Sequence, residues 1–205
     1  MPKKCVIISG GEYSPIKGLN PEDFVIACDR GCAYAARQGI VPDLIVGDFD
    51  SYAGPLPEGV PIKRHQPEKD DTDTVIAVRY AVEQGFEELE LHCALGGRLD
   101  HTLANIQTLS FAAAHGLRAW IKGKRAELTV LTGGGLRLAR REGWAFSLFS
   151  LSDETSGVGI RGAKYPLENA RLTNCFPLGV SNEWADGEAE VTLSSGLLLV
   201  VLAKL

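Results

Sequence analysis

The sequence predicts an α/β amino-terminal domain, a largely parallel sheet with helices on both faces, followed by an all-β sandwich domain. Over roughly the first 120 residues, short apolar runs alternate with helical stretches, which is typical of a parallel sheet joined by crossover helices. Beyond Lys122 we find no helical periodicity of useful length, and short apolar runs are separated by turn-rich pieces. We therefore predict an α/β domain over residues 1–122 and a β-sandwich over residues 123–205.

The predicted elements follow from residue type and periodicity. Apolar or β-branched runs bounded by Gly, Pro or Asp predict strands at residues 6–9, 24–28, 44–47, 62–65, 89–94 and 118–121. Helices are predicted between them at residues 32–38, 73–84 and 100–115. In the second helix, Val75, Val78 and Val82 recur at helical spacing, and Gly85 is a typical stop. In the sandwich, the runs at residues 127–131, 145–151 and 197–202 predict strands.

The composition limits the class of protein. The 205 residues are 45% apolar and 23% charged, as in an ordinary globular protein. No apolar run approaches the roughly 20 residues that span a bilayer, and we expect a soluble protein with no signal peptide and no membrane partner. Five cysteines without a Cys-x-x-Cys pair predict reduced, buried thiols and a cytoplasmic location. The net charge of −5 argues against a nucleic-acid partner.

Two aspartates follow the third predicted strand. Asp48 and Asp50 lie two positions apart, directly after an apolar run. If the chain stays extended there, its period of two places both carboxylates on the same face. Paired carboxylates repel each other unless a cation lies between them, and oxygen ligands suit Mg²⁺. The alternative is that both aspartates are turn formers or helix caps.

A second acidic loop leads into the second predicted helix. Glu68, Asp70, Asp71 and Asp73 lie within six positions, with Thr72 among them. Thr72 or Asp71 can cap the helix, and acidic groups in a first turn are stabilised by the helix dipole. Because one helix needs only one cap, the additional acidic residues indicate a functional site.

The third loop combines glycine with charge. Gly96 and Gly97 allow a close approach of backbone N–H groups to a ligand, and the helix that follows favours an anion at its start. Arg98 can form a bidentate contact with phosphate. Asp100 can cap the helix or join a metal site. The sequence contains no Walker loop, since Gly-x₄-Gly-Lys-Ser/Thr occurs nowhere in it.

The three loops are predicted at the same edge of one sheet, because ligands of parallel α/β sheets bind at the carboxyl ends of the strands. Asp48, Asp50, Asp73 and Asp100 can therefore converge. Four carboxylates without a cation would be unfavourable, whereas Mg²⁺ and a triphosphate would remove the conflict. Arg98 would neutralise charge that develops during transfer. The sequence thus predicts a metal-dependent enzyme that acts on the phosphates of a nucleotide.

These loops resemble those of the thiamine pyrophosphokinase family, which transfers diphosphate from ATP to the hydroxyl of thiamine and forms thiamine diphosphate and AMP. The matching segments occur in the family's order from about residue 27 to 182. They are Ala27-Cys-Asp29-Arg-Gly31, Pro42-Asp43, Gly47-Asp-Phe-Asp-Ser51, Asp71-Thr-Asp73, Gly96-Gly-Arg98-Leu-Asp100-His101 and Ser181-Asn182.

The resemblance implies roles for individual residues. Asp48, Asp50, Asp73 and Asp100 become the catalytic and Mg²⁺-binding group, with Arg98 as a phosphate contact. The nucleotide side comprises Asp29, Arg30, Gly31, Gly47, Gly96, Gly97 and Arg98. The thiamine side comprises Lys69, Asp71, Thr72, Asp73, Ser181, Asn182 and Trp184. Lys69 stands where some members of the family have Gln, and Trp184 is either a stacking partner for thiamine or a packing residue of the sandwich.

The resemblance further implies a homodimer whose active sites lie between one subunit's α/β domain and its partner's sandwich. Two alternatives differ in their requirements. A nucleotide-sugar transferase would use the Asp-x-Asp motif without the second acidic loop or the Ser-Asn motif. A non-catalytic thiamine or nucleotide sensor would bind ligands without needing all four carboxylates.

Overall fold

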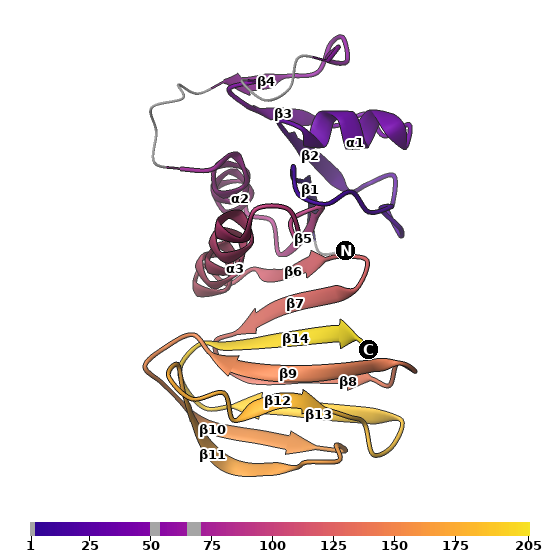
Figure 1. The fold of residues 1–205 in the computed structure, drawn as a ribbon. Coiled ribbons are helices and arrows are strands. Elements are labelled where there is room, and N and C mark those ends of the chain that lie inside the picture. The colour runs from indigo at the N-terminus through magenta and orange to yellow at the C-terminus, as the bar shows by residue number, and fades with distance from the viewer. Residues whose placement is uncertain (1–2, 50–53, 65–70) are drawn as a thin grey trace. The chain divides into compact units, whose positions relative to one another are not determined.

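The structure is a computed structural model that describes residues 3–49, 54–64 and 71–205 (Figure 1). The chain divides into two compact units, Met1–Lys124 and Arg125–Leu205, which we call unit 1 and unit 2. Each unit has its own sheet arrangement and its own buried core, and each is described by itself below.

Unit 1 alternates strands and helices along the chain, as the sequence predicts. Its strands are β1 (Lys4–Ile8), β2 (Phe24–Cys28), β3 (Leu44–Gly47), β4 (Ile62–Arg64), β5 (Glu88–His92) and β6 (Arg118–Lys122). Its helices are α1 (Gly31–Arg37), α2 (Asp73–Glu83) and α3 (Leu99–Ala114). The predicted bounds of these elements agree with the observed ones to within two residues wherever the structure describes them.

The strands of unit 1 form a parallel sheet in the order β6-β5-β1-β2-β3-β4. The chain moves outward from β1 to β4 and then returns to add β5 and β6 on the other side of β1. The carboxyl ends of β1 and β5 therefore flank a topological switch point, which is where open α/β sheets bind their ligands. This confirms the predicted fold class of the amino-terminal part.

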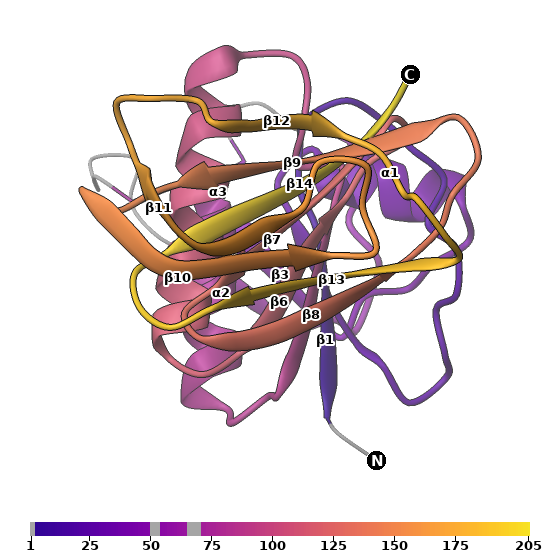
Figure 2. The same ribbon diagram turned by 90° about the horizontal axis from the view of Figure 1, so that it is seen from below.

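Helices cover both faces of this sheet, with α1 on one face and α2 and α3 on the other (Figures 1 and 2). On the α1 face, Ala35 packs against buried residues of β1 and β2. The buried side of α2 consists mainly of small residues: Thr74, Ala77, Val78 and Ala81. The helix predicted from the spacing of three valines is confirmed, with Val78 buried and Val75 and Val82 half-buried. Small side chains let α2 lie close to the sheet.

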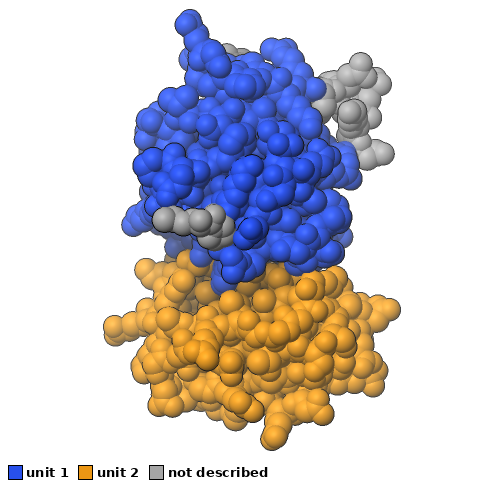
Figure 3. Space-filling model, turned by 180° about the vertical axis from the view of Figure 1, so that it is seen from behind, with its two compact units in different colours: residues 1–124 blue, residues 125–205 orange. Residues whose placement is uncertain are grey.

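Unit 2, orange in Figure 3, is an antiparallel β-sandwich. Its strands are β7 (Ala126–Leu131), β8 (Gly134–Ala139), β9 (Trp144–Ser150), β10 (Glu154–Arg161), β11 (Leu167–Thr173), β12 (Gly179–Asn182), β13 (Glu188–Leu193) and β14 (Leu198–Lys204). One layer has the order β12-β9-β14-β7 and the other β11-β10-β13-β8. The strand pairs within these two layers are antiparallel, as predicted.

The core of unit 2 follows the period of two that a half-buried strand requires. Phe146 and Leu148 of β9 are buried, as are Val158 and Ile160 of β10. The strand β14 is more continuously apolar, and its residues 198–200 are all buried. Apolar side chains from both layers thus form the interior of the sandwich.

The cysteines follow the prediction with one exception. Cys5, Cys28, Cys32 and Cys93 are buried free thiols. Cys175 is exposed, contrary to the prediction, because it lies in the turn segment between β11 and β12 rather than in an apolar run. None of the helices in the described ranges has both the length and the apolar character to cross a membrane.

Candidate active site

The loops after β1 and β5 continue side by side beyond the ends of the strands. The N–H groups of Gly11 and Glu12 donate to the carbonyl oxygens of Cys93 and Leu95 at 2.7 and 2.8 Å. Gly11 has no room for a side chain, since a Cβ there would lie 2.7 Å from each of these two oxygens. The backbone alone therefore fixes the two loops that flank the switch point.

The turn after β2 is equally crowded. Asp29 has a left-handed φ of 42°, and its N–H donates to the carbonyl oxygen of Val46 at 3.0 Å. Arg30 is exposed, whereas Gly31 is buried at the first position of α1. A Cβ on Gly31 would lie 2.0 Å from the carbonyl oxygen of Ile8. The Asp-Arg-Gly segment therefore lies at the carboxyl edge of the sheet, between the ends of β1 and β3.

The segment after β3 does not stay extended, which removes the premise of the period-two argument. Phe49 has a φ of 63°, an uncommon conformation for an aromatic residue. Its ring packs against buried residues of β2, α1 and β3, and the guanidinium of Arg64 lies 5.2 Å from the ring centroid. Asp48 precedes this turn, and Asp50 lies outside the described residues. Packing of the ring accounts for the sharp change of direction.

The start of α2 uses its polar residues in different ways. Thr72 is the N-cap, as one alternative predicted, and its hydroxyl accepts the N–H of Val75 at 3.3 Å. Asp71 forms an ion pair with Arg79 at 2.6 Å. Asp73 occupies the first turn. Lys69 and Asp70, which the sequence also nominated, lie outside the described residues.

Two buried thiols, Cys28 and Cys32, lie at the end of β2 and the start of α1. Burial is the main cause that raises the pKa of the Cys32 thiol to about 11, and the negative charges of Asp29 and Asp73 raise it further. The same causes raise the pKa of the Cys28 thiol well above its usual value. The negative charges of Asp29 and Asp73 thus act on both thiols. The two thiols remain protonated and inert at neutral pH.

The loop after β5 presents two glycines and an ion pair. Gly96 and Gly97 have left-handed φ values of 76° and 69°, and Gly96 lies directly against the side chain of Glu12. Arg98 donates to both carboxylate oxygens of Asp100, from Nε at 3.1 Å and from Nη2 at 2.5 Å. The hydrogen bond from Arg98 holds the pKa of Asp100 below its usual value. Both side chains are exposed, at 73% and 62%, so they are accessible to a ligand.

Helix α3 is anchored just behind this ion pair. The buried Asn105 donates through Nδ2 to the carbonyl oxygen of Ala94 at 2.8 Å, which ties the helix to the loop that precedes it. The N–H of His101 donates to Asp100 at 3.0 Å. The side chain of His101 is exposed in the first turn of α3.

The predicted convergence of four aspartates stays a prediction. Asp50 lies outside the described residues. Within residues 3–49, 54–64 and 71–205, no three or more His, Cys, Asp or Glu side chains are arranged to hold a metal ion. The structure describes Asp29 in the turn after β2 and Asp73 in the first turn of α2, while Asp100 contacts Arg98. Asp48, Asp73 and Asp100 all lie in segments at the carboxyl edge of the sheet.

In unit 2, the Ser-Asn motif forms a shaped backbone turn at β12. The amide of the buried Asn182 donates to the carbonyl oxygen of Tyr165 at 2.7 Å and accepts the N–H of the same residue at 3.0 Å. Ser181 is exposed with a left-handed φ of 58°, and its N–H donates to the hydroxyl of Ser147 at 2.9 Å. Asn182 therefore fixes the backbone while Ser181 points into solvent.

Trp184 is committed to packing within the sandwich. Its exposed fraction is 8%, its indole N–H donates to the carbonyl oxygen of Leu138 at 2.7 Å, and its ring meets Phe146 edge-on at 5.1 Å. These contacts leave little ring surface for a ligand. Of the two alternatives for this residue, packing accounts for its position.

Left-handed backbone conformations mark the same segments. Five described residues other than glycine have a positive φ. Asp29 and Cys93 directly follow β2 and β5, Phe49 is the second residue after β3, and Ser181 belongs to the Ser-Asn motif. Such conformations are unfavourable for most residues and cluster at functional sites. Their positions favour the carboxyl edge of the unit 1 sheet as the reactive region.

Sequence reasoning missed the contribution of the loop after β1. Ser9 is buried and its hydroxyl lies 2.9 Å from that of Thr74 on α2. Glu12 extends over Gly96 on the opposite side of the switch point. The Ser-Gly-Gly run at residues 9–11 directly follows an apolar strand, and this signal could have identified the loop.

Comparisons with known proteins give one family. The family model described as "Thiamin pyrophosphokinase, catalytic domain" matches residues 17–121, and "Thiamin pyrophosphokinase, vitamin B1 binding domain" matches residues 136–198. A thiamine pyrophosphokinase of Bacillus subtilis is 26% identical over 209 residues, covering 97% of this chain and 98% of the relative.

Two solved structures share the fold over nearly the full length. The crystal structure of thiamine pyrophosphokinase from Bacillus subtilis has a TM-score of 0.91 at 24% identity, covering 98% of this chain and 99% of that one. That of thiamin pyrophosphokinase from Geobacillus thermodenitrificans has a TM-score of 0.84 at 27% identity, covering 98% and 97%. The likeness therefore includes both units.

Proposed function

The chain belongs to the thiamin pyrophosphokinase family, and from this premise we propose how its own residues bind the substrates and transfer the diphosphate. The reaction of this family moves diphosphate from ATP to the hydroxyl of thiamine. The observation that carries the assignment is the pair of family matches, of which the first covers just over half of the chain. Membership of this family favours an enzyme that consumes ATP over the nucleotide-sugar transferase and the sensor.

The nucleotide is proposed to bind at the carboxyl edge of the unit 1 sheet. The left-handed Gly96 and Gly97 precede the 16-residue helix α3, whose start favours an anion. Arg98 is exposed and can donate a bidentate contact to phosphate oxygens. We assign the other side of the nucleotide to Asp29, Arg30 and Gly31, between β2 and α1, and to Gly47, the last residue of β3.

We propose Mg²⁺ as the metal, held by Asp48, Asp50, Asp73 and Asp100. The residues fit the ion because carboxylate oxygens are the ligands that Mg²⁺ prefers. The Arg98–Asp100 ion pair fits as well, since both partners are exposed and an arriving phosphate can replace Asp100 on Arg98. The carboxylate of Asp100 then becomes available to a cation. The bound ion would neutralise charge on the phosphate oxygens.

In the proposed transfer, the hydroxyl oxygen of thiamine attacks the β-phosphorus of ATP. An oxygen–phosphorus bond forms, the bond from the β-phosphorus to the oxygen shared with the α-phosphate breaks, and AMP leaves with that oxygen. We assign the hydroxyl proton to Asp73, in the first turn of α2. Arg98 stabilises the negative charge of the transferred group.

The thiamine side is proposed to include Lys69, Asp71, Thr72 and Ser181, with Asn182 shaping the backbone beside Ser181. Asp71 and Thr72 flank the start of α2, and Ser181 is exposed. We assign Trp184 to the sandwich core on the strength of its packing.

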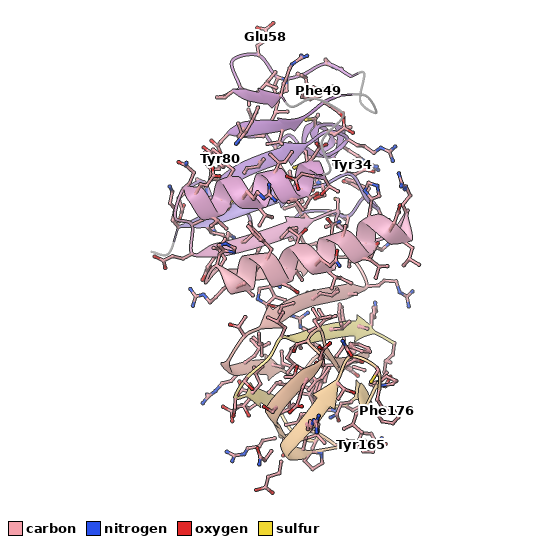
Figure 4. All side chains as sticks on the ribbon, turned by 90° about the vertical axis from the view of Figure 1, so that its left-hand side faces the viewer. Tyr34, Phe49, Glu58, Tyr80, Tyr165 and Phe176 are labelled. Carbon is pink, nitrogen blue, oxygen red and sulfur yellow. The ribbon has the colours of Figure 1, made fainter. Side chains whose placement is uncertain are left out.

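We also propose a homodimer, with active sites between one subunit's α/β domain and its partner's sandwich, and a cytoplasmic location. Exposed apolar side chains of unit 2 support association: Tyr165, Phe176, Leu178 and Val180 are each about half exposed or more, and Figure 4 labels the two aromatic ones. A molar mass from light scattering equal to one chain would contradict the dimer.

Product analysis tests the reaction directly. The full chain is incubated with ATP, Mg²⁺ and thiamine, and the products are identified by mass spectrometry. Thiamine diphosphate and AMP are expected in equal amounts, and neither without Mg²⁺. Absence of AMP in the complete mixture would overturn the proposed reaction, and equal yield without any divalent metal would overturn the metal assignment.

A further inference from the structure

We propose that Ser9 and Thr74 are positioning residues, whose buried hydroxyl pair holds the first turn of α2, and with it Asp73, against the carboxyl end of β1. The inference rests on the proposed role of Asp73 in the transfer. Neither Ser9 nor Thr74 belongs to the site residues that the sequence nominated, and both are buried.

The pair itself is short and shielded from water. The two hydroxyl oxygens lie 2.9 Å apart, and Ser9 and Thr74 have exposed fractions of 2% and 7%. The N–H of Ser9 donates to the carbonyl oxygen of His92 at 2.9 Å, so the backbone of Ser9 is part of the pairing between β1 and β5. The backbone of Ser9 is therefore fixed by the sheet. Its hydroxyl contacts that of Thr74, the residue next to Asp73.

A second contact reaches the same turn from the neighbouring strand. The thiol of Cys28, the last residue of β2, donates to the carbonyl oxygen of Asp73 at 3.7 Å. The first turn of α2 is thus held at two points. Ser9, at the end of β1, contacts the side chain of Thr74, and Cys28, at the end of β2, contacts the backbone carbonyl of Asp73. Two attachment points restrict both the translation of this turn and its rotation about the helix axis.

The chemistry of the pair favours a role in position over a role in stability. Replacing both partners of a buried hydrogen bond by apolar groups of the same shape can be nearly neutral for stability. A hydrogen bond between hydroxyl groups nevertheless has a narrow range of distance and angle. A hydroxyl pair therefore specifies where the α2 turn lies. Displacement of a catalytic group by about 1 Å can lower the rate roughly a hundredfold.

The chain offers a matched control. In unit 2, the hydroxyls of Ser150 and Thr155 lie 2.8 Å apart and both residues are buried. They are also a buried hydroxyl pair, with further hydrogen bonds to Ser152 and Leu197 that make their loss at least as costly for stability, and neither is adjacent to a residue assigned to the site. The test compares Ser9→Ala, Thr74→Val and their double variant with Ser150→Ala and Thr155→Val, and adds the conservative Thr74→Ser and the inactive reference Asp73→Asn.

The expected result separates position from stability. Ser9→Ala and Thr74→Val each lower kcat by about 10- to 100-fold, while KM for thiamine changes less than about twofold. The double variant resembles either single variant because both remove the same interaction. Thr74→Ser keeps kcat, and the Mg²⁺ concentration for half-maximal rate rises only in the variants that lose the pair. The control variants lower Tm and leave kcat unchanged.

The possible results distinguish the positioning inference from the proposed role of Asp73. If Ser9→Ala and Thr74→Val keep full kcat while Asp73→Asn is inactive, the positioning inference is wrong and the role of Asp73 stands. If Asp73→Asn itself keeps full activity, the proposed role of Asp73 fails and the inference fails with it. A loss of kcat in the control variants equal to that in the Ser9 variant would show a general stability effect and refute positioning. Should Thr74→Val not fold, Ser9→Ala and Thr74→Ser carry the test.

Discussion

Replacing Gly31 by alanine places a methyl group where the backbone leaves no room. Gly31 is buried at the first position of α1, and a Cβ there would lie 2.0 Å from the carbonyl oxygen of Ile8 and 2.8 Å from its carbonyl carbon. Ordinary contact begins at 3.4 Å, so the start of α1 and the end of β1 must separate by about 1.4 Å. Both partners are backbone, and no flexible side chain can absorb this movement.

Overpacking of this kind typically lowers the free energy of unfolding by about 1–3 kcal/mol. Because two backbone segments collide, we expect the upper end, about 3 kcal/mol, which lowers Tm by roughly 6–12 °C in a chain of this size. Thermal unfolding followed by circular dichroism measures the change. Gly187→Ala is the control, since a Cβ at Gly187 meets no atom within 4 Å and Tm should stay the same.

The same substitution tests why the Asp-Arg-Gly segment contains a glycine. The added methyl group would point at β1, so we expect KM for ATP to rise because the turn that carries Arg30 is displaced. A Gly31→Ala variant that unfolds at the same temperature as the parent chain would refute the packing argument. The glycine would then have to be explained by direct contact with the nucleotide.

Three further variants test other contacts of the structure. Trp184→Phe removes the donor to a buried carbonyl and should lower the free energy of unfolding by about 1–3 kcal/mol, with KM for thiamine unchanged in steady-state assays. Asp100→Asn should abolish turnover and leave Tm unchanged, because Asp100 and its partner Arg98 are both exposed. The pKa of Glu90 is lowered by the hydrogen bond from His92, against the opposing effect of burial. Since its folded pKa lies below the unfolded value, Glu90 stabilises the fold above that value and loses this effect as pH falls through the folded pKa. Glu90→Gln should therefore lower the free energy of unfolding at neutral pH. In urea unfolding, this free energy should then fall less steeply as the pH is lowered.

For each of these variants, one result would contradict the expectation. A large rise in KM for thiamine in Trp184→Phe, with unchanged stability, would place the indole in the substrate site. Full turnover in Asp100→Asn would remove this carboxylate from the catalytic group. If the free energy of unfolding of Glu90→Gln falls with decreasing pH as steeply as that of the parent chain, other groups dominate acid unfolding.

The sequence was sufficient for the architecture because local signals agreed with one another there. The strands β2 and β3 have the predicted bounds, since each is an apolar run bounded by residues that break strands. The change from alternating strands and helices to closely spaced strands identified the sandwich. Placing the functional loops at one edge needed only the rule that parallel strands share a direction.

Contacts between distant segments were beyond sequence reasoning. The turn at Phe49 depends on packing of its ring, which no local pattern encodes. The pairing of Ser9 with Thr74 joins residues 65 positions apart and depends on how α2 lies on the sheet. Trp184 was ambiguous, because an aromatic residue near a turn suits a ligand site and a core equally well. In each case the deciding contact joins segments that are distant in the sequence.

The irregular strand β12 has a consequence for solubility. It is the outermost strand of its layer in unit 2, so it presents an unsatisfied backbone edge. Its pairing with β9 shifts register between Gly179 and Asn182, and Ser181 within it turns left-handed. A foreign strand cannot extend a ladder past such an interruption. The irregularity thereby hinders the addition of further strands at this edge.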